Sequence, residues 1–79
     1  MFSKIGSATM DRKLVQQHLE LAERHVSQGL RHVAQQRDLV ELLERDGHDT
    51  REANRLLRLF EDTLELHLRD RDRLRKELA

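Results

Sequence analysis

The sequence predicts an all-α protein: an antiparallel two-helix hairpin, coiled-coil-like in its packing, that dimerises into a four-helix bundle. Three observations predict this fold class. Ala, Glu, Lys, Leu and Arg make up more than half of the 79 residues, which is typical of long or coiled helices. Apolar residues recur in alternating steps of four and three, the rhythm of a helix packed along its length on another. Proline is absent, and Gly47 interrupts the pattern.

The first nine residues mix small, polar and apolar types without any period. We therefore expect a flexible N-terminal arm over residues 1–9 and a helical hairpin over residues 10–79. A hydroxyl from Ser7 or Thr9 is expected to cap the first helix, because it can accept from an unpaired backbone N–H.

The first helix is predicted over about residues 10–46. Its apolar stripe continues along the whole segment, so the helix needs a packing partner over its full length. The members of this stripe are Val15, Leu19, Ala22, Val26, Gly29, Val33, Gln36, Val40 and Leu43.

A tight turn is predicted over residues 47–49. Gly47 can end the first helix in a left-handed conformation without steric cost. Asp49 is expected to cap the second helix, with Glu52 three residues later at capping-box spacing. So short a connection requires the two helices to lie antiparallel.

The second helix is predicted over about residues 50–78. Folding the hairpin at residue 48 sets Val33 near Leu64 and Gly29 opposite His67. Several layers then pair a small residue with a large one, as close packing requires. The stripe of this helix consists of Ala53, Leu57, Phe60, Leu64, His67, Arg71, Leu74 and Leu78.

Each helix also carries leucines beside its stripe, and a two-helix hairpin would leave them exposed. Burial of one leucine is worth roughly 1.5–3 kcal/mol, so several together favour an oligomer. We therefore expect a homodimer, or binding to another protein. The expected interface residues are Leu14, Leu21, Leu39, Leu42, Leu56, Leu59 and Leu66.

The histidines break the leucine pattern. His18, His25 and His32 are seven residues apart, and the expected register places the His67 ring between those of His25 and His32. Three imidazoles could hold Zn²⁺ or a similar metal, or could titrate together and loosen the interface. The simpler interpretation is a polar layer that pins the register, with no cofactor.

The composition argues against several function classes. Fifteen basic and fifteen acidic residues balance to zero, which argues against steering toward DNA or an anionic membrane. There is no cysteine, no membrane-length apolar run and no signal-peptide pattern, so we expect a cytoplasmic protein. No nucleophile–base set or phosphate loop is present, which predicts a non-enzymatic chain without a small-molecule substrate.

The segments AERHVSQGLRHVAQQRDLVELLERDGHDTREANRLL and DRDRLRKEL resemble small uncharacterised bacterial helical-hairpin proteins. In these proteins the first helix carries spaced histidines and a Gly-His-Asp-Thr turn leads into the second. The resemblance covers about residues 12–78. It implies the hairpin fold and a bacterial cytoplasmic origin, and it implies no activity.

The function predicted from these features is protein–protein interaction by a self-associating adaptor or regulatory subunit. One alternative is a metal- or pH-responsive bundle that uses His25, His32 and His67. A weaker alternative is a nucleic-acid-associated regulator that uses the arginine-rich end of the second helix, residues 69–76.

Overall fold

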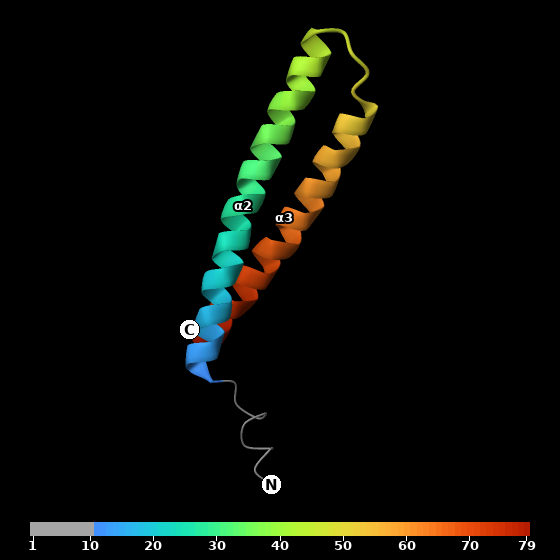
Figure 1. The fold of residues 1–79 in the computed structure, drawn as a ribbon. Helices are drawn as coiled ribbons and strands as arrows, with labels where there is room; N and C mark the ends of the chain where they lie inside the picture. Colours follow the sequence, from blue (N-terminus) through green and yellow to red (C-terminus); the bar gives the residue numbers. More distant parts are fainter. Residues whose placement is uncertain (1–10) are drawn as a thin grey trace.

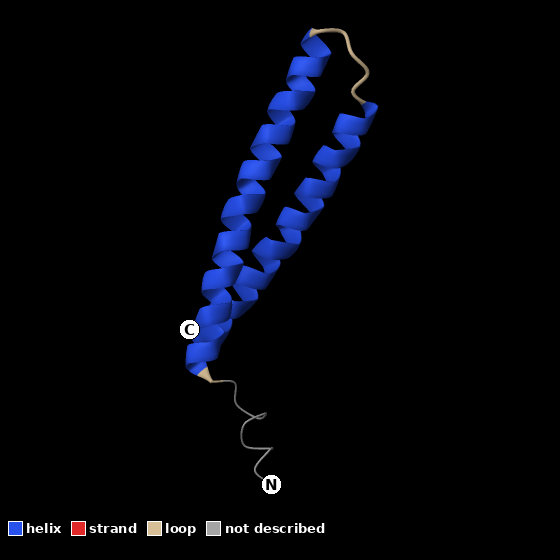
Figure 2. Cartoon of the chain, in the orientation of Figure 1, coloured by secondary structure: helices blue, strands red, loops and turns tan. Residues whose placement is uncertain are grey.

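The computed structural model describes residues 11–79, which form two long helices joined by a short connection (Figure 1). Helix α2 spans Arg12–Arg45 and helix α3 spans Arg51–Leu78. The two helices run antiparallel, and no strand occurs in this part of the chain (Figure 2). The predicted helical hairpin is thus confirmed. The predicted arm over residues 1–9, with its candidate caps Ser7 and Thr9, lies outside the described residues.

Helix α2 begins at Arg12 because Asp11 caps it. One carboxylate oxygen of Asp11 accepts from the backbone N–H of Lys13 at 3.0 Å. The Asp11 carbonyl accepts the first helical hydrogen bond, from the N–H of Val15. An aspartate at this position satisfies an otherwise unpaired N–H and places negative charge at the positive end of the helix dipole.

The core is the narrow stripe predicted for each helix, and every member of both stripes is buried or half-buried. The buried positions on α2 are mainly valine and alanine, whereas α3 contributes larger residues such as Leu74, the least exposed side chain at 2%. Leu74 packs with Val15 and Ala22, where the start of α2 meets the end of α3. Small residues on one helix and large residues on the other allow a close approach of the two backbones.

Gly47 ends α2 in the expected way. Its φ is +74°, a left-handed conformation that disfavours residues with a Cβ. The N–H of Gly47 donates to the carbonyl of Glu44, and the N–H of His48 donates to that of Leu43. This pair of bonds is the Schellman motif, which satisfies two carbonyls at the helix end.

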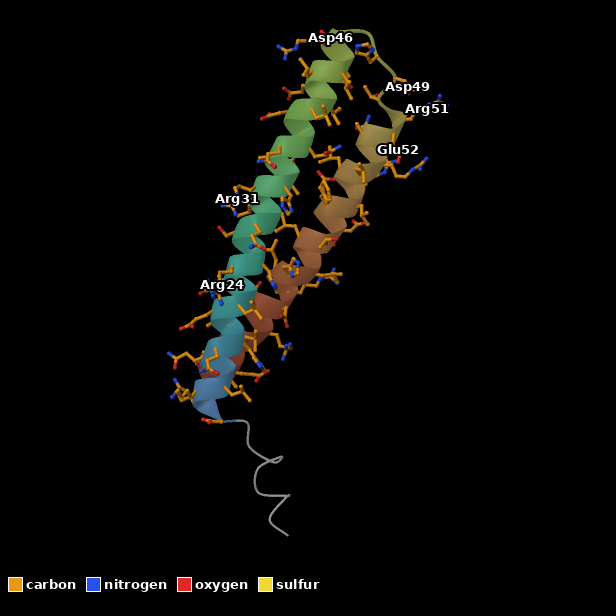
Figure 3. All side chains as sticks on the ribbon, viewed as in Figure 1. Arg24, Arg31, Asp46, Asp49, Arg51 and Glu52 are labelled. Atoms are coloured by element: carbon orange, nitrogen blue, oxygen red, sulfur yellow. The ribbon has the colours of Figure 1, made fainter. Side chains whose placement is uncertain are left out.

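The start of α3 differs in detail from the expected capping box. Thr50 occupies the cap position without a side-chain cap bond, while Asp49 accepts from the Arg51 backbone N–H at 3.0 Å. The Arg51 guanidinium also lies 2.8 Å from the Asp49 carboxylate (Figure 3). These bonds lower the pKa of Asp49, chiefly through the guanidinium. Glu52 does not reach back to the cap, because it pairs with Arg55 at 3.1 Å.

The connection between the helices spans residues 46–50 rather than 47–49. It descends beside the end of α2, so α3 begins lower than α2 ends (Figure 1). The register is consequently shifted by about one helical turn from the predicted one. Gly29 faces Leu64 instead of His67, and the buried Gln36 donates to the carbonyl of Ala53 at 2.9 Å.

We predict that Gly47→Ala destabilises the hairpin by about 1–2 kcal/mol, the usual cost of a left-handed conformation for a residue with a Cβ. No atom lies within 4 Å of the position such a Cβ would take, so the whole effect comes from the backbone. Urea unfolding followed by circular dichroism measures it. Gly47→Asn is the matched control, and it should lose less because asparagine tolerates this conformation. Equal losses in both variants would contradict the explanation.

Asp49→Asn should give a pH-dependent loss of stability. The pKa of Asp49 is lower in the folded chain than its ordinary value of 3.8, so the folded state favours the carboxylate. The resulting stabilisation is complete above pH 3.8 and is lost as the pH falls through the lowered pKa. Thermal melts should show the wild type above Asp49→Asn at pH 7, with the two converging in acid. Asp62→Asn, on the exposed surface of α3, is the matched control for the loss of one carboxylate, and a loss of stability at pH 7 equal to that of Asp49→Asn would contradict the role of Asp49.

Candidate functional site

Two surfaces of the hairpin flank the buried stripe, one on each side. On each helix, one surface carries the residues directly before the stripe positions and the other carries the residues directly after them. Side chains one position apart in a helix point about 100° apart. Because antiparallel helices are related by a two-fold axis normal to their common plane, positions with the same offset lie on the same surface in both helices. Whether an exposed residue comes directly before or directly after a stripe position therefore predicts on which of the two surfaces it lies.

The first surface, here called the leucine face, carries all seven leucines predicted as interface residues. Each lies one position before a member of the stripe, and each remains between 38% and 63% exposed. Four of these leucines lie near the connection between the helices, two on α2 and two on α3. The members of the leucine face are Leu14, Leu21, Leu39, Leu42, Leu56, Leu59 and Leu66.

The opposite surface, here called the ion-pair face, is crossed by salt bridges between the helices. Arg37 contacts Glu61 at 3.0 Å and Arg75 contacts Glu23 at 3.3 Å. All four residues lie one position after a member of the stripe. Leu30 is the one leucine on this face that is as exposed as those of the leucine face, at 56%. The leucines of α2 and α3 are thus distributed unequally between the two faces.

A pocket of about 210 Å³ opens in the middle of the leucine face. It separates the leucines near the connection from those near the ends of the chain. Polar and aromatic side chains from both helices form its walls. The residues that line this histidine pocket are His25, Gln28, Gly29, His32, Phe60, Thr63 and His67.

The structure brings two of the three candidate imidazoles together. The rings of His25 and His67 have centroids 4.9 Å apart and are tilted by 43°. The ring of His32 lies instead against Phe60, at 5.9 Å between centroids. His67 therefore does not enter between His25 and His32 as predicted, because the register is shifted by one turn. Within residues 11–79 of a single chain, no group of three or more His, Cys, Asp or Glu side chains could hold a metal ion.

Gly29 shapes the pocket by allowing close approach of α3. A Cβ at this position would lie 3.0 Å from Cδ1 of Leu64 and 3.6 Å from its Cβ. The pairing of small with large residues along the stripe is preserved, since a leucine rather than a histidine fills the space beside the glycine. Gly29 is also one of the residues that line the histidine pocket.

The arginine-rich end of α3 is a surface of ion pairs. Arg69 contacts Glu65 at 3.2 Å and Arg71 contacts Asp72 at 3.0 Å. Arg73 lies between two carboxylates, of Asp70 at 2.6 Å and Glu77 at 2.8 Å, and this raises its pKa. The positive charge of this segment is largely matched by carboxylates of the same chain. Such pairing weakens any field toward a nucleic acid.

Two features of these surfaces were not predicted from the sequence. The first is the contact of Phe60 with His32, which depends on the register. The second is the pair of salt bridges on the ion-pair face. The sequence did contain a signal for these salt bridges, because residues of opposite charge directly follow stripe positions on the two helices. The outer side of α2 is charged as well, and Arg24 and Arg31 point away from α3 (Figure 3).

None of the helices described within residues 11–79 is apolar over a length sufficient to cross a membrane. No known protein family, curated protein or solved structure matches the chain. The resemblance to bacterial hairpin proteins therefore stays a prediction.

We predict that Gly29→Val destabilises the hairpin by about 1–3 kcal/mol, because the added side chain would overpack the contact with Leu64. The matched control is Ala34→Val, at an exposed position of the same helix, where only helix propensity changes by a few tenths of a kcal/mol. Chemical unfolding measures both. A Gly29→Val chain as stable as the Ala34→Val chain would contradict the close approach at Gly29.

Proposed function

We propose that the chain is a non-enzymatic protein–protein interaction module that self-associates through the leucine face into a four-helix bundle, as an adaptor or regulatory subunit. The observation that carries this proposal is the one-sided exposure of seven leucines. Scattered apolar residues are normal on a protein surface, whereas exposed leucines gathered on one face of two helices are typical of an interaction site.

The thinness of the core supports association. Seven hydrophobic residues are buried, and none of the described side chains falls below 2% exposure. A chain this small seldom buries enough apolar surface alone to fold stably, and many such chains gain the missing stability by forming oligomers. Burial of a half-exposed leucine contributes roughly 1 kcal/mol, so seven from each copy can offset an association cost of about 4–15 kcal/mol.

A second copy is the occupant that the surface fits best. The formal net charge is zero, so two copies do not repel each other through their overall charge. Two helices from each copy, packed through one face, give the four-helix arrangement that such amphipathic hairpins commonly form. The ion pairs at the end of α3 favour this interpretation over a nucleic-acid contact, because few of its arginines are free to meet phosphates.

The test uses two leucines of equal exposure on opposite faces. Leu59 and Leu30 are both 56% exposed, so Leu59→Lys and Leu30→Lys should have similar effects on a single hairpin. We expect sedimentation at micromolar concentration to give twice the chain mass of 9.4 kDa for the wild type and for Leu30→Lys. Leu59→Lys should sediment as a monomer, because burial of the lysine charge costs several kcal/mol.

Circular dichroism of each variant verifies that the helices persist. A wild-type chain that stays monomeric would contradict self-association. An equal loss of dimer in the two lysine variants would contradict the assignment of the leucine face as the interface.

A further inference from the structure

The histidine pocket lies at the midpoint of the hairpin. Gly29 is in the middle of α2 and Leu64 is in the middle of α3, and these two residues contact each other. The pocket opens beside this contact on the leucine face. A pocket lined by polar and aromatic side chains thus lies at the centre of the face, with leucines on either side of it.

This central position has a consequence for a symmetric dimer. If the two-fold axis runs along the helices, each layer of one copy faces the same layer of the other. If the axis is perpendicular to the helices, full overlap of the two faces places their midpoints together. Either arrangement, being closed and symmetric, sets one histidine pocket against the other.

Two pockets that face each other enclose polar groups which need partners. Buried polar side chains are nearly always hydrogen-bonded or bound to a metal. The pocket of each copy contributes the imidazoles of His25 and His67, and neutral imidazole nitrogen is a common metal ligand. In four-helix bundles, metal sites are formed in this way by inward-facing side chains of opposing helices.

The geometry of the imidazole pair suits a shared ion. Zinc binds histidine nitrogen at about 2.0–2.1 Å in a tetrahedral arrangement, which places the centroids of two coordinating rings roughly 5 Å apart. The centroids of His25 and His67 are 4.9 Å apart and come from different helices. One chain supplies two ligands only, since His32 lies against Phe60, so the site is incomplete without a second copy.

We infer that His25 and His67 of two copies together bind one transition-metal ion of the Zn²⁺ class at the centre of the dimer. This inference rests on the proposed self-association through the leucine face. Four imidazoles match the coordination number of zinc. The bound ion would bridge the two leucine faces and hold their midpoints in register.

The first experiment compares the wild-type chain in EDTA with the chain given Zn²⁺ alone. Isothermal titration should show one Zn²⁺ ion per two chains, and Co²⁺ in its place should give the visible absorption of tetrahedral coordination. Sedimentation in both conditions should show the dimer, with a higher melting temperature when Zn²⁺ is present.

The second experiment uses histidine variants. His25→Gln and His67→Gln should each weaken Zn²⁺ binding at least about tenfold, since even the loss of an outer-shell partner costs that much. His18→Gln and His48→Gln, both at exposed positions outside the pocket, should bind as the wild type does. His32→Gln, inside the pocket, should also retain binding. Circular dichroism of each apo variant establishes that the hairpin is folded.

The outcomes separate this inference from the proposed function. A dimer in EDTA that takes up no Zn²⁺ would overturn the metal site and leave self-association intact. Binding that survives both His25→Gln and His67→Gln, or that is lost equally in the control variants, would overturn the ligand assignment. A chain that is monomeric in both conditions would overturn both proposals. A dimer that forms only with Zn²⁺ would support the metal site and contradict association by the leucines alone.

Discussion

The hairpin depends on one constraint: two packed helices can each bury a single narrow stripe. In this chain α2 presents mainly small and β-branched residues along its stripe, and α3 presents larger ones, with Gly29 against Leu64 at the centre. The close approach that results excludes water from a thin core. Side chains one position away from the stripe remain at the surface. The two sides of the hairpin differ in the chemistry of these side chains.

The two sides have different chemistry for this reason. Residues after the stripe form salt bridges between the helices, as with Arg37 and Glu61. Such exposed pairs contribute little to stability, about 0–1 kcal/mol each, but they keep their side of the hairpin polar. Seven of the residues before the stripe are leucines that no other part of residues 11–79 covers. This asymmetry and the thinness of the core together support the proposed self-association.

The connection between the helices decides which histidines meet. The Schellman motif at Gly47 ends α2, and the five-residue connection then descends before α3 begins. That descent brings His67 beside His25 and leaves His32 beside Phe60. A local backbone geometry at one end of the molecule thus determines the composition of a pocket near its middle, because two rigid helices transmit the offset along their length.

The sequence by itself determined the two helices, the glycine at the turn, the buried stripe and the leucines beside it. Apolar periodicity specifies which side of each helix is buried, and it does so residue by residue from Val15 to Leu78. The tertiary structure alone decided the register and, with it, the partners of the histidines. The physical reason is that a stripe of alternating four- and three-residue steps looks nearly the same after a shift of one turn. Such a shift buries the same residues and changes only which of them face each other, so the path of the connection had to select the pairing.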